Sequence, residues 1–562
     1  MKKLRWQLII IFLTGLVVGV LLLGEQPAAQ PNQAPQPVRG GIYTEALVGS
    51  MQRLNPVLDY NNNVDHDINR LIFSGLLRFD DRGLAQLDMA EAYGVSRDGT
   101  LYNFTLQKGM HWQDGQPVTT DDVLFTIDLM RKGGTIVPAD LQALWKDVKA
   151  VRLSDTTLQF QLPEPYAPFL DYLTFGILPK HLLNNLTFDQ VASAPFNLKP
   201  VGSGPYRFDH LMVENGQITG LVLMAWDQYY GKKPYVEQIV FRFYPDGTAA
   251  LQAYNDGAVQ GISEITPEIL QASLAETNLS IYTGRKPQLS MVLFNLKNQD
   301  KTFLQDADVR RALFMGINRQ RIINQVLDGQ AVLANGPILP GTWAYYDGLQ
   351  TQDFDPEGAK NLLKQAGYVL ASETDTVRTK DKVALNFTLL YPGDDLHKSI
   401  AVAIQKDWAN LNVQADLEPV PYDQLINDRL GQRAYDAALV DLNLSRTPDP
   451  DPYPFWDQAQ AATGQNYTQW DSRVASEYLE QARIEVDLTE RTRLYRDFQV
   501  VFDEDLPALP LYYPVYSYAV DKGVQGVRMG PLFDTSDRFD TILDWFFAVK
   551  RTTSAPTLTP GK

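Results

Sequence analysis

The chain contains no cysteine. Disulfides, thiolate nucleophiles, cysteine-ligated zinc, iron–sulfur clusters and a lipidated cysteine anchor are therefore all excluded. Stability has to come from burial, and 562 residues exceed what a single hydrophobic core can organise. The sequence therefore predicts a body of two or three lobes.

The N-terminus carries an export signal. A basic patch of Lys2, Lys3 and Arg5 precedes an apolar run from Leu8 to Leu23. Such a pattern directs the rest of the chain out of the cytoplasm, either as a cleaved signal peptide or as a retained anchor. Cleavage after Ala29 would place Pro27 at the third-last position, which fits a cleavage site poorly. We therefore expect residues 1–24 to stay as an N-terminal membrane anchor.

Two segments flank the body. Residues 25–39 are rich in Pro, Gln and Ala and predict a flexible linker, and residues 548–562 predict a disordered tail. No later apolar run reaches the length of a membrane span, so we expect the body to be soluble and extracytoplasmic.

Composition and missing motifs narrow the function. The net charge of −17 disfavours nucleic acid as a partner. None of the five histidines has a partner at helical zinc-site spacing, and we find no phosphate-binding loop and no nucleophile elbow. We therefore expect no catalytic residues, no metal and no cofactor. An extracytoplasmic hydrolase stays an alternative only because carboxylates are abundant.

Strand and helix patterns alternate along the body. Strands are expected at residues 40–47, 101–106 and 509–520, where apolar residues run or alternate. Helices are expected after the Thr119–Asp122 cap, over 308–327, after Asp355 and over 474–498. This alternation predicts α/β lobes.

Several motifs in a fixed order resemble one family. They comprise Gly40–Tyr43 with Leu54–Pro56, Phe73–Leu77, Ser96–Gly99 through Trp112 to Val123, Ile177–His181, Gly202–Tyr206, Asp308–Leu313, Ala334–Pro340, Phe354–Tyr368 and Pro448–Pro452. Together they resemble the oligopeptide/dipeptide/nickel-binding receptors (family 5) of ATP-binding-cassette importers, over roughly residues 40–547. Each motif also has a structural reading, such as the Asp98-Gly99 turn.

The resemblance implies a class II periplasmic-binding-protein-like fold, in which two lobes surround a ligand cleft and an additional domain enlarges the body. We expect lobe I to comprise residues 40–60, 197–285 and 505–547, the additional domain residues 61–196 and lobe II residues 286–504. The implied partners are a small ligand or peptide and the permease subunits, with the chain itself a monomer.

The resemblance also implies where a ligand would lie, with one departure. The family carries a Gly-Trp pair followed by an acid, whereas Leu442 stands where the tryptophan belongs. Asp441 and Asp449 are the candidates for binding a ligand amino group, and Arg446 is a candidate for binding an anion. The other candidates are aromatic or acidic side chains expected on the opening strand, in loops or on the late strand: Tyr43, Glu45, Tyr60, Trp343, Tyr345, Tyr512 and Tyr513.

The leading hypothesis is a receptor that binds a small solute, with peptides the leading ligand class, and delivers it to an importer by closure of the cleft. A membrane-anchored sensory or accessory module is the second hypothesis, and the hydrolase is the third. Nickel chelates and sugars stay open as ligands.

Overall fold

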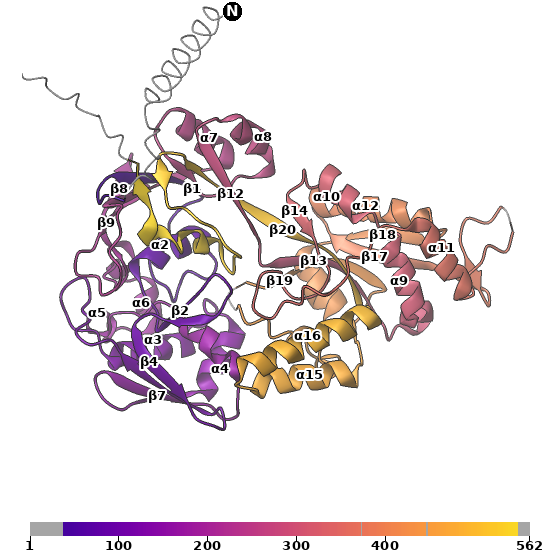
Figure 1. Cartoon of the computed structure of the whole chain (residues 1–562), viewed down its shortest axis with the longest axis horizontal. Coiled ribbons are helices and arrows are strands. Elements are labelled where there is room, and N and C mark those ends of the chain that lie inside the picture. The colour runs from indigo at the N-terminus through magenta and orange to yellow at the C-terminus, as the bar shows by residue number, and fades with distance from the viewer. Residues whose placement is uncertain (1–36, 373, 446–447, 549–562) are drawn as a thin grey trace, which may run out of the picture.

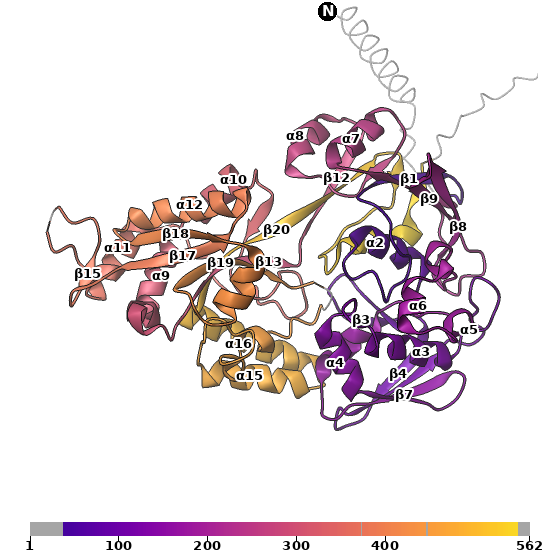
Figure 2. The ribbon, with the colours of Figure 1, turned by 180° about the vertical axis from the view of Figure 1, so that it is seen from behind.

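The computed structural model describes residues 37–372, 374–445 and 448–548. These residues form a mixed α/β molecule with two lobes and an additional domain, which confirms the predicted fold class (Figure 1). The residue limits predicted for the three units stay a prediction. Figure 2 shows the same arrangement from behind, with one lobe beside the additional domain and the other lobe extending away from both.

Lobe I is built on half of a long mixed sheet. β1 (Ile42–Val48) pairs in parallel with β10 (Gln238–Tyr244) and β11 (Gly261–Ile262), and β10 continues antiparallel into β9 (Gln217–Ala225) and β8 (Tyr206–Glu214). Around this half of the sheet lie α2 (Asn63–Ile72), which falls within the range predicted for the additional domain, and α7 (Gly247–Asn255), α8 (Pro267–Ala275), β12 (Leu279–Arg285), β21 (Val524–Gln525) and β22 (Phe546–Phe547).

Lobe II carries the other half of that sheet. Its strands are β13 (Gln288–Phe294), β14 (Ala331–Leu333), β17 (Asn386–Pro392), β18 (Gln414–Val420) and β19 (Ala437–Asn443), with the hairpin β15 (Thr379–Lys380) and β16 (Val383–Ala384) beside them. Its longer helices are α9 (Ala307–Met315), α10 (Arg319–Gln325), α11 (Pro356–Gln365), α12 (Asp395–Ala409), α15 (Arg473–Ile484) and α16 (Leu488–Asp505).

One strand belongs to both lobes. β20 (Ala508–Asp521) pairs with β13 and β14 of lobe II at its start, and with β11 and β12 of lobe I at its end. Between these parts the pairing with β13 is irregular near Ser290. The chain therefore passes between the lobes twice, near residue 286 and near residue 514, on two adjacent strands.

The additional domain has a separate antiparallel sheet in the order β4-β5-β7-β6. Its strands are β4 (Ala90–Val95), β5 (Leu101–Leu106), β6 (Lys149–Arg152) and β7 (Thr157–Gln161), and its helices include α3 (Thr120–Arg131), α4 (Ala139–Asp147), α5 (Lys180–Leu183), α6 (Phe188–Ala192) and the 3-10 turn η1 (Ala167–Leu173). Trp145, Phe160 and Phe169 pack edge-to-face or tilted in its core. The short strands β2 (Leu77–Phe79) and β3 (Ala85–Leu87) form a separate ribbon.

The local signals of the sequence account for many of these boundaries. The Asp122 carboxylate accepts the Thr119 backbone N–H at 2.8 Å, which completes the capping box that begins α3. Asp355 accepts the Gly358 N–H at 2.8 Å at the start of α11, and Gly367 with φ +94° follows its end. The helices expected over 308–327, after Asp355 and over 474–498 are therefore confirmed, the last as α15 followed by α16.

A buried ion cluster holds the C-terminal segment against lobe I. Arg538 is 0% exposed and pairs with Glu45 of β1 and Asp67 of α2, each at 2.8 Å. The Glu45 carboxylate also accepts hydrogen bonds from the hydroxyls of Tyr43 and Tyr518. Three segments far apart in the sequence are thereby joined at one point.

Within these three ranges, no helix is both long enough and apolar enough to cross a bilayer. The expected anchor, residues 1–24, and the expected linker and tail fall mainly outside the described residues, so those expectations stay predictions.

Replacing Arg538 with methionine should destabilise lobe I by about 3–5 kcal/mol, because two buried carboxylates would lose their cation. Arg528→Met is the matched control, since Arg528 is 69% exposed and its pair with Asp544 should contribute less than about 1 kcal/mol. Thermal unfolding followed by circular dichroism measures both. Equal melting temperatures for the two variants would contradict the structural role of the cluster.

Candidate functional site: a cavity between the lobes

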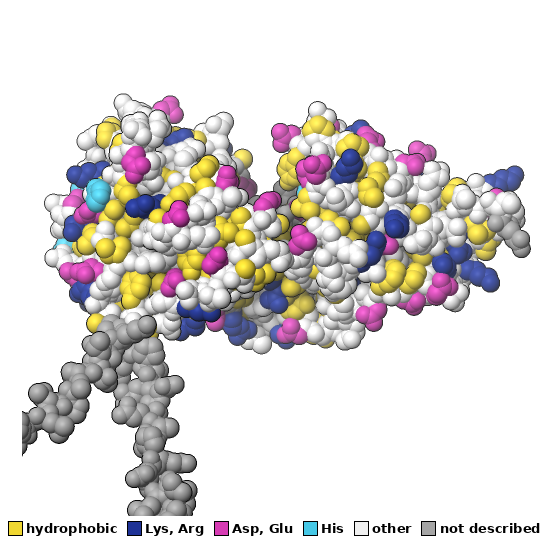
Figure 3. Space-filling model, turned by 90° about the horizontal axis from the view of Figure 1, so that it is seen from above, with side chains coloured by type: hydrophobic (Ala, Val, Ile, Leu, Met, Phe, Trp, Pro, Cys, Tyr) yellow, Lys and Arg dark blue, Asp and Glu magenta, His cyan; other side chains and the backbone are white. Residues whose placement is uncertain are grey.

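A cavity of about 1050 Å³ lies where lobe I, the additional domain and lobe II meet. Seen from above, a notch separates the two halves of the molecule (Figure 3). Most of the wall comes from α2 and the residues after it, from the additional domain and from residues 533–544. Of the described lobe II residues, four belong to the wall: Asn443, Ser445, Phe455 and Gln465. A solute in this cavity would therefore contact both lobes.

Three aspartates at equal spacing form one part of the wall. Asp534, Asp537 and Asp540 flank or lie within the 3-10 turn η6 (Thr535–Phe539), and all three line the cavity. In a 3-10 helix, residues three apart lie on the same side. Arg538 is anchored in the buried cluster described above, so the turn holds its cation inward while the aspartates line the cavity.

Local contacts position these aspartates. The backbone N–H groups of Phe533 and Asp534 both donate to Asp537 Oδ2 at 2.8 Å, and Asp540 pairs with Arg70 of α2 at 2.7 Å. Enclosure by protein and the neighbouring Asp540 carboxylate raise the pKa of Asp537 to about 7. Enclosure also raises the pKa of Asp540, and Arg70 opposes that shift.

His66 lies beside this group. Its ring nitrogens lie 3.2 Å from Asp59 and 3.5 Å from Asp534. Burial disfavours the charged imidazolium, but the two carboxylates outweigh it and raise the pKa of His66. The histidine is therefore cationic at neutral pH and offsets part of the negative charge.

A polar contact joins the additional domain to lobe II beside the cavity. The Asp449 backbone N–H donates to Asp171 of η1 at 2.6 Å, and the Asp449 carboxylate pairs with Arg491 of α16. The loop after β19 makes a further contact, in which the Tyr166 hydroxyl donates to Asp451 at 3.3 Å.

This contact concentrates carboxylates. Burial raises the pKa of Asp451 to about 6, although Arg483 lies 3.1 Å away and opposes the shift. Burial and the Asp449 carboxylate raise the pKa of Asp171 well above its ordinary value. The Arg483 guanidinium also lies 5.1 Å from the Tyr166 ring and 4.3 Å from the Tyr453 ring. Protonation of Asp451 or Asp171 would therefore change the contact between the additional domain and lobe II.

The structure separates the residues predicted for the site into several environments. Of those described, Tyr60 lines the cavity. Tyr43 and Glu45 lie in the buried ion cluster, and Tyr513 is fully buried, with its hydroxyl donating to the Gly336 and Ile338 carbonyls.

Two further groups of predicted residues lie in lobe II. Asp441 accepts hydrogen bonds from Gln288 and Ser290 and lies 3.2 Å from His397, while the buried Tyr512 pairs with Ser290 in the sheet. Trp343 packs in a tilted arrangement against Tyr495, which also donates to Asp449. Tyr345 is partly buried against the lobe II core. Arg446 falls outside the described residues.

Sequence reasoning did not single out the aspartates of residues 534–540. Their signal was the repeat of an acid at every third position in Asp-Thr-Ser-Asp-Arg-Phe-Asp. Phe455, Tyr229 and Tyr230 were also missed as cavity residues, and they carry no local pattern that separates them from core aromatics.

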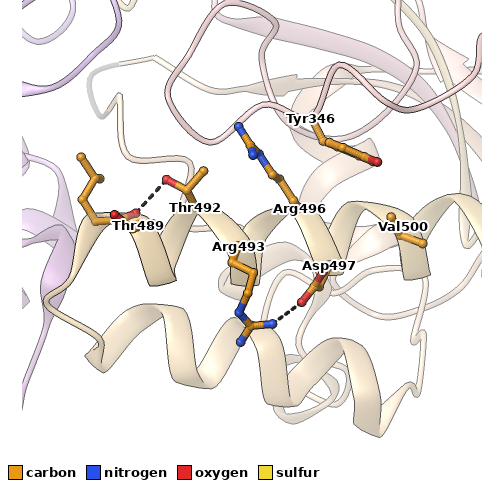
Figure 4. A pocket seen from close by; sticks show the side chains of 8 residues that line it. Tyr346, Thr489, Thr492, Arg493, Arg496, Asp497 and Val500 are labelled. Atoms are coloured by element: carbon orange, nitrogen blue, oxygen red, sulfur yellow. Dashed lines mark hydrogen bonds and ion pairs between the residues drawn. The ribbon is translucent and has the colours of Figure 1, made fainter.

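A second hollow of about 620 Å³ lies on α16 (Figure 4). Arg493 there already pairs with Asp497 and Glu490. The hollow shares no lining residue with the interlobe cavity. We therefore take the interlobe cavity as the candidate site.

Comparison with known proteins agrees with this geometry. Residues 85–465 match the family described as bacterial extracellular solute-binding proteins, family 5 Middle. The chain is 26% identical to the oligopeptide-binding protein AppA of Bacillus subtilis, over 90% of this chain and 92% of that protein. It is 27% identical to the dipeptide-binding protein of Escherichia coli, over 92% of this chain and 96% of that protein. The solved structure of the ABC transporter substrate-binding protein CtaP from Listeria monocytogenes shares the fold, with a TM-score of 0.73, 24% identity and coverage of 91% and 100%.

The raised pKa of Asp451 predicts a specific pH dependence. Between about pH 4 and about pH 6 the folded chain holds a proton that the unfolded chain releases, so this contribution to stability is lost as the pH rises through about 6. The Asp451→Asn variant has no carboxyl at this position, so it does not lose this contribution to stability. Its melting temperature relative to the wild type should therefore rise between about pH 4.5 and about pH 7.5, by the equivalent of about 2 kcal/mol.

Asp471→Asn is the control, because Asp471 is 60% exposed and lies on the outer surface beside Lys297. The difference in melting temperature between this variant and the wild type should change little over the same pH range. If the melting temperatures of the two variants, relative to the wild type, changed with pH in the same way, the pKa of Asp451 would not be raised.

Proposed function

The chain belongs to family 5 of the bacterial extracellular solute-binding proteins, and on that premise we propose that it captures a peptide in the interlobe cavity and delivers it to an ATP-binding-cassette importer. The single observation that carries the proposal is a cavity lined by both lobes of a molecule whose lobes share two adjacent strands. Relatives named as oligopeptide- and dipeptide-binding proteins cover nine-tenths of the chain and support peptides as the ligand class.

Capture would proceed by closure. The chain crosses between the lobes on β20 and on the β12–β13 connection, so a change in backbone angles there rotates lobe II toward the cavity. A peptide favours the closed state only to the extent that it contacts both lobes. The lobe II residues Phe455 and Asn443 supply that second set of contacts.

We propose that Asp441 and Arg446 bind the two ends of the peptide. Asp441 is partly exposed and could accept the ammonium of a peptide, with His397 and Ser290 holding the carboxylate in place. Arg446 is the proposed partner of a peptide carboxylate. Such contacts select the ends of a peptide and leave its side chains free to vary.

Members of this family are receptors, and we propose that this chain, too, acts without catalysing a reaction. We further propose that it works as a monomer outside the cytoplasm. Residues 1–24 would hold it at the membrane, which would raise its concentration near the permease.

Peptide binding should weaken when lobe II loses its aromatic contact. We expect Phe455→Ala to raise the dissociation constant for a tripeptide such as Ala-Phe-Ala by about tenfold, because a buried aromatic contact is lost on closure. Isothermal titration of the full chain in detergent micelles measures this.

Tyr422→Ala is the control, since Tyr422 is on lobe II, is 56% exposed and does not line the cavity. Small-angle scattering should also show a smaller radius of gyration with saturating peptide. No binding of any di- to pentapeptide, with no change in radius, would refute the proposed function.

The anchor has its own test. In the membrane fraction, intact-mass measurement should return the full 63.3 kDa chain. A soluble product that begins near residue 30 would instead show cleavage, and the tether would be wrong while peptide capture stayed open.

A further inference from the structure

The cavity between the lobes carries an excess of negative charge on one side. In the part of the chain that the structure describes, eight aspartates line it, against three Arg or Lys side chains and His66. Among the described residues, lobe II contributes Asn443, Ser445, Phe455 and Gln465, none of which is charged. The excess therefore belongs to the wall formed by lobe I, the additional domain and the C-terminal segment.

The cations of this wall do not neutralise it. Arg70 is engaged by Asp540 and Lys232 by Asp544. Arg78 lies close enough to Asp88 and Asp540 to oppose the rise that burial causes in the pKa of each carboxyl. His66 lies between two carboxylates, those of Asp59 and Asp534. Asp537, between these residues, makes no ion pair with any described side chain, and the hydrogen bonds to its carboxylate come from backbone N–H groups.

A second observation on the same wall points to a missing donor. The Asn69 side chain is 3% exposed and lines the cavity. Its amide nitrogen donates to Asp59 at 2.9 Å, but among the described residues nothing donates to its carbonyl oxygen. A buried acceptor without a donor is costly, and a ligand N–H group in the cavity would relieve that cost.

Carboxylate and amide oxygens together are what a primary ammonium or a guanidinium requires, because both groups donate several hydrogen bonds and carry a positive charge. The cavity volume of about 1050 Å³ suits an organic molecule of peptide size. A Lys or Arg side chain would reach the aspartates while the peptide backbone lies between the lobes.

We propose that the Asp534–Asp537–Asp540 wall, with Asn69, receives the positively charged side chain of a lysine or arginine residue in the bound peptide. This inference rests on the peptide capture proposed above and assigns its preferred substrate class, cationic peptides. Asp537 is the central acceptor because it has no cation of its own.

The test uses three tripeptides that differ in one side chain: Ala-Lys-Ala, Ala-Gln-Ala and Ala-Glu-Ala. Titration calorimetry of the full chain in detergent micelles at about pH 8, above the pKa of about 7 of Asp537, should give Ala-Lys-Ala a dissociation constant about tenfold lower than Ala-Gln-Ala, with Ala-Glu-Ala the weakest. The advantage of lysine should shrink at high salt, because screening weakens charge pairing at a water-filled site.

Asp537→Asn should reduce the preference for lysine over glutamine to less than about threefold, because the lysine ammonium loses its charged acceptor. The asparagine oxygen can still accept the two backbone N–H groups, so the turn should fold. Asp471→Asn removes the same charge from the outer surface and should leave the preference intact, which separates a local effect from the overall negative charge of the protein.

The outcomes distinguish the two proposals. If all three tripeptides bind equally, or if Asp537→Asn and Asp471→Asn behave alike, the cationic preference is refuted and peptide capture survives. If none of the tripeptides binds, and the longer peptides also fail, both proposals are refuted together.

Discussion

The strand β20 is the constraint on which the rest of this molecule depends. One end of it is paired into lobe II and the other into lobe I, and only the β12–β13 connection crosses beside it in the described chain. Two adjacent strands resist sliding, because sliding would break their hydrogen bonds, but they permit bending where the pairing is irregular. The lobes can therefore rotate about this line while each keeps its own core. The cavity is lined by residues of both lobes, so its width is the quantity that the rotation changes.

The negative wall of the cavity depends on a buried cation. Arg538 alternates along the C-terminal turn with the aspartates that line the cavity, and its pairs with Glu45 and Asp67 fix the orientation of the turn. A turn this short has little stability of its own. The fully buried pairs of Arg538 supply the stability that the turn lacks. They also hold the three carboxylates near one another.

Much of the fold could be predicted from the sequence, because its signals are local. The alternation of residues 101–106 matches β5, and the capping residues Thr119, Asp122 and Asp355 mark true helix starts. The site was harder to predict. Tyr43 and Glu45 were correctly expected on the opening strand, but the cation that binds Glu45 lies 493 positions away and leaves no local trace. The spacing of Asp534, Asp537 and Asp540 is visible in the sequence, yet the cavity they line exists only because α2 and the additional domain pack opposite them.

The two walls of the cavity offer different kinds of contact to a ligand. Charge lies on the side formed by lobe I, the additional domain and the C-terminal segment, and within the described residues the lobe II side offers neutral polar groups and the Phe455 ring. A ligand held by charge alone would bind the open molecule as well as the closed one, and it would not shift the equilibrium between them. Closure must therefore be driven by the contacts that lobe II adds, which are the Phe455 ring, the neutral polar groups and the proposed contacts of Asp441 and Arg446 with the ends of the peptide. Because the lobe II contacts are made to the backbone and ends that every peptide shares, a receptor built this way would select side chains by charge on one wall while contacts with the other wall drive closure for any bound peptide.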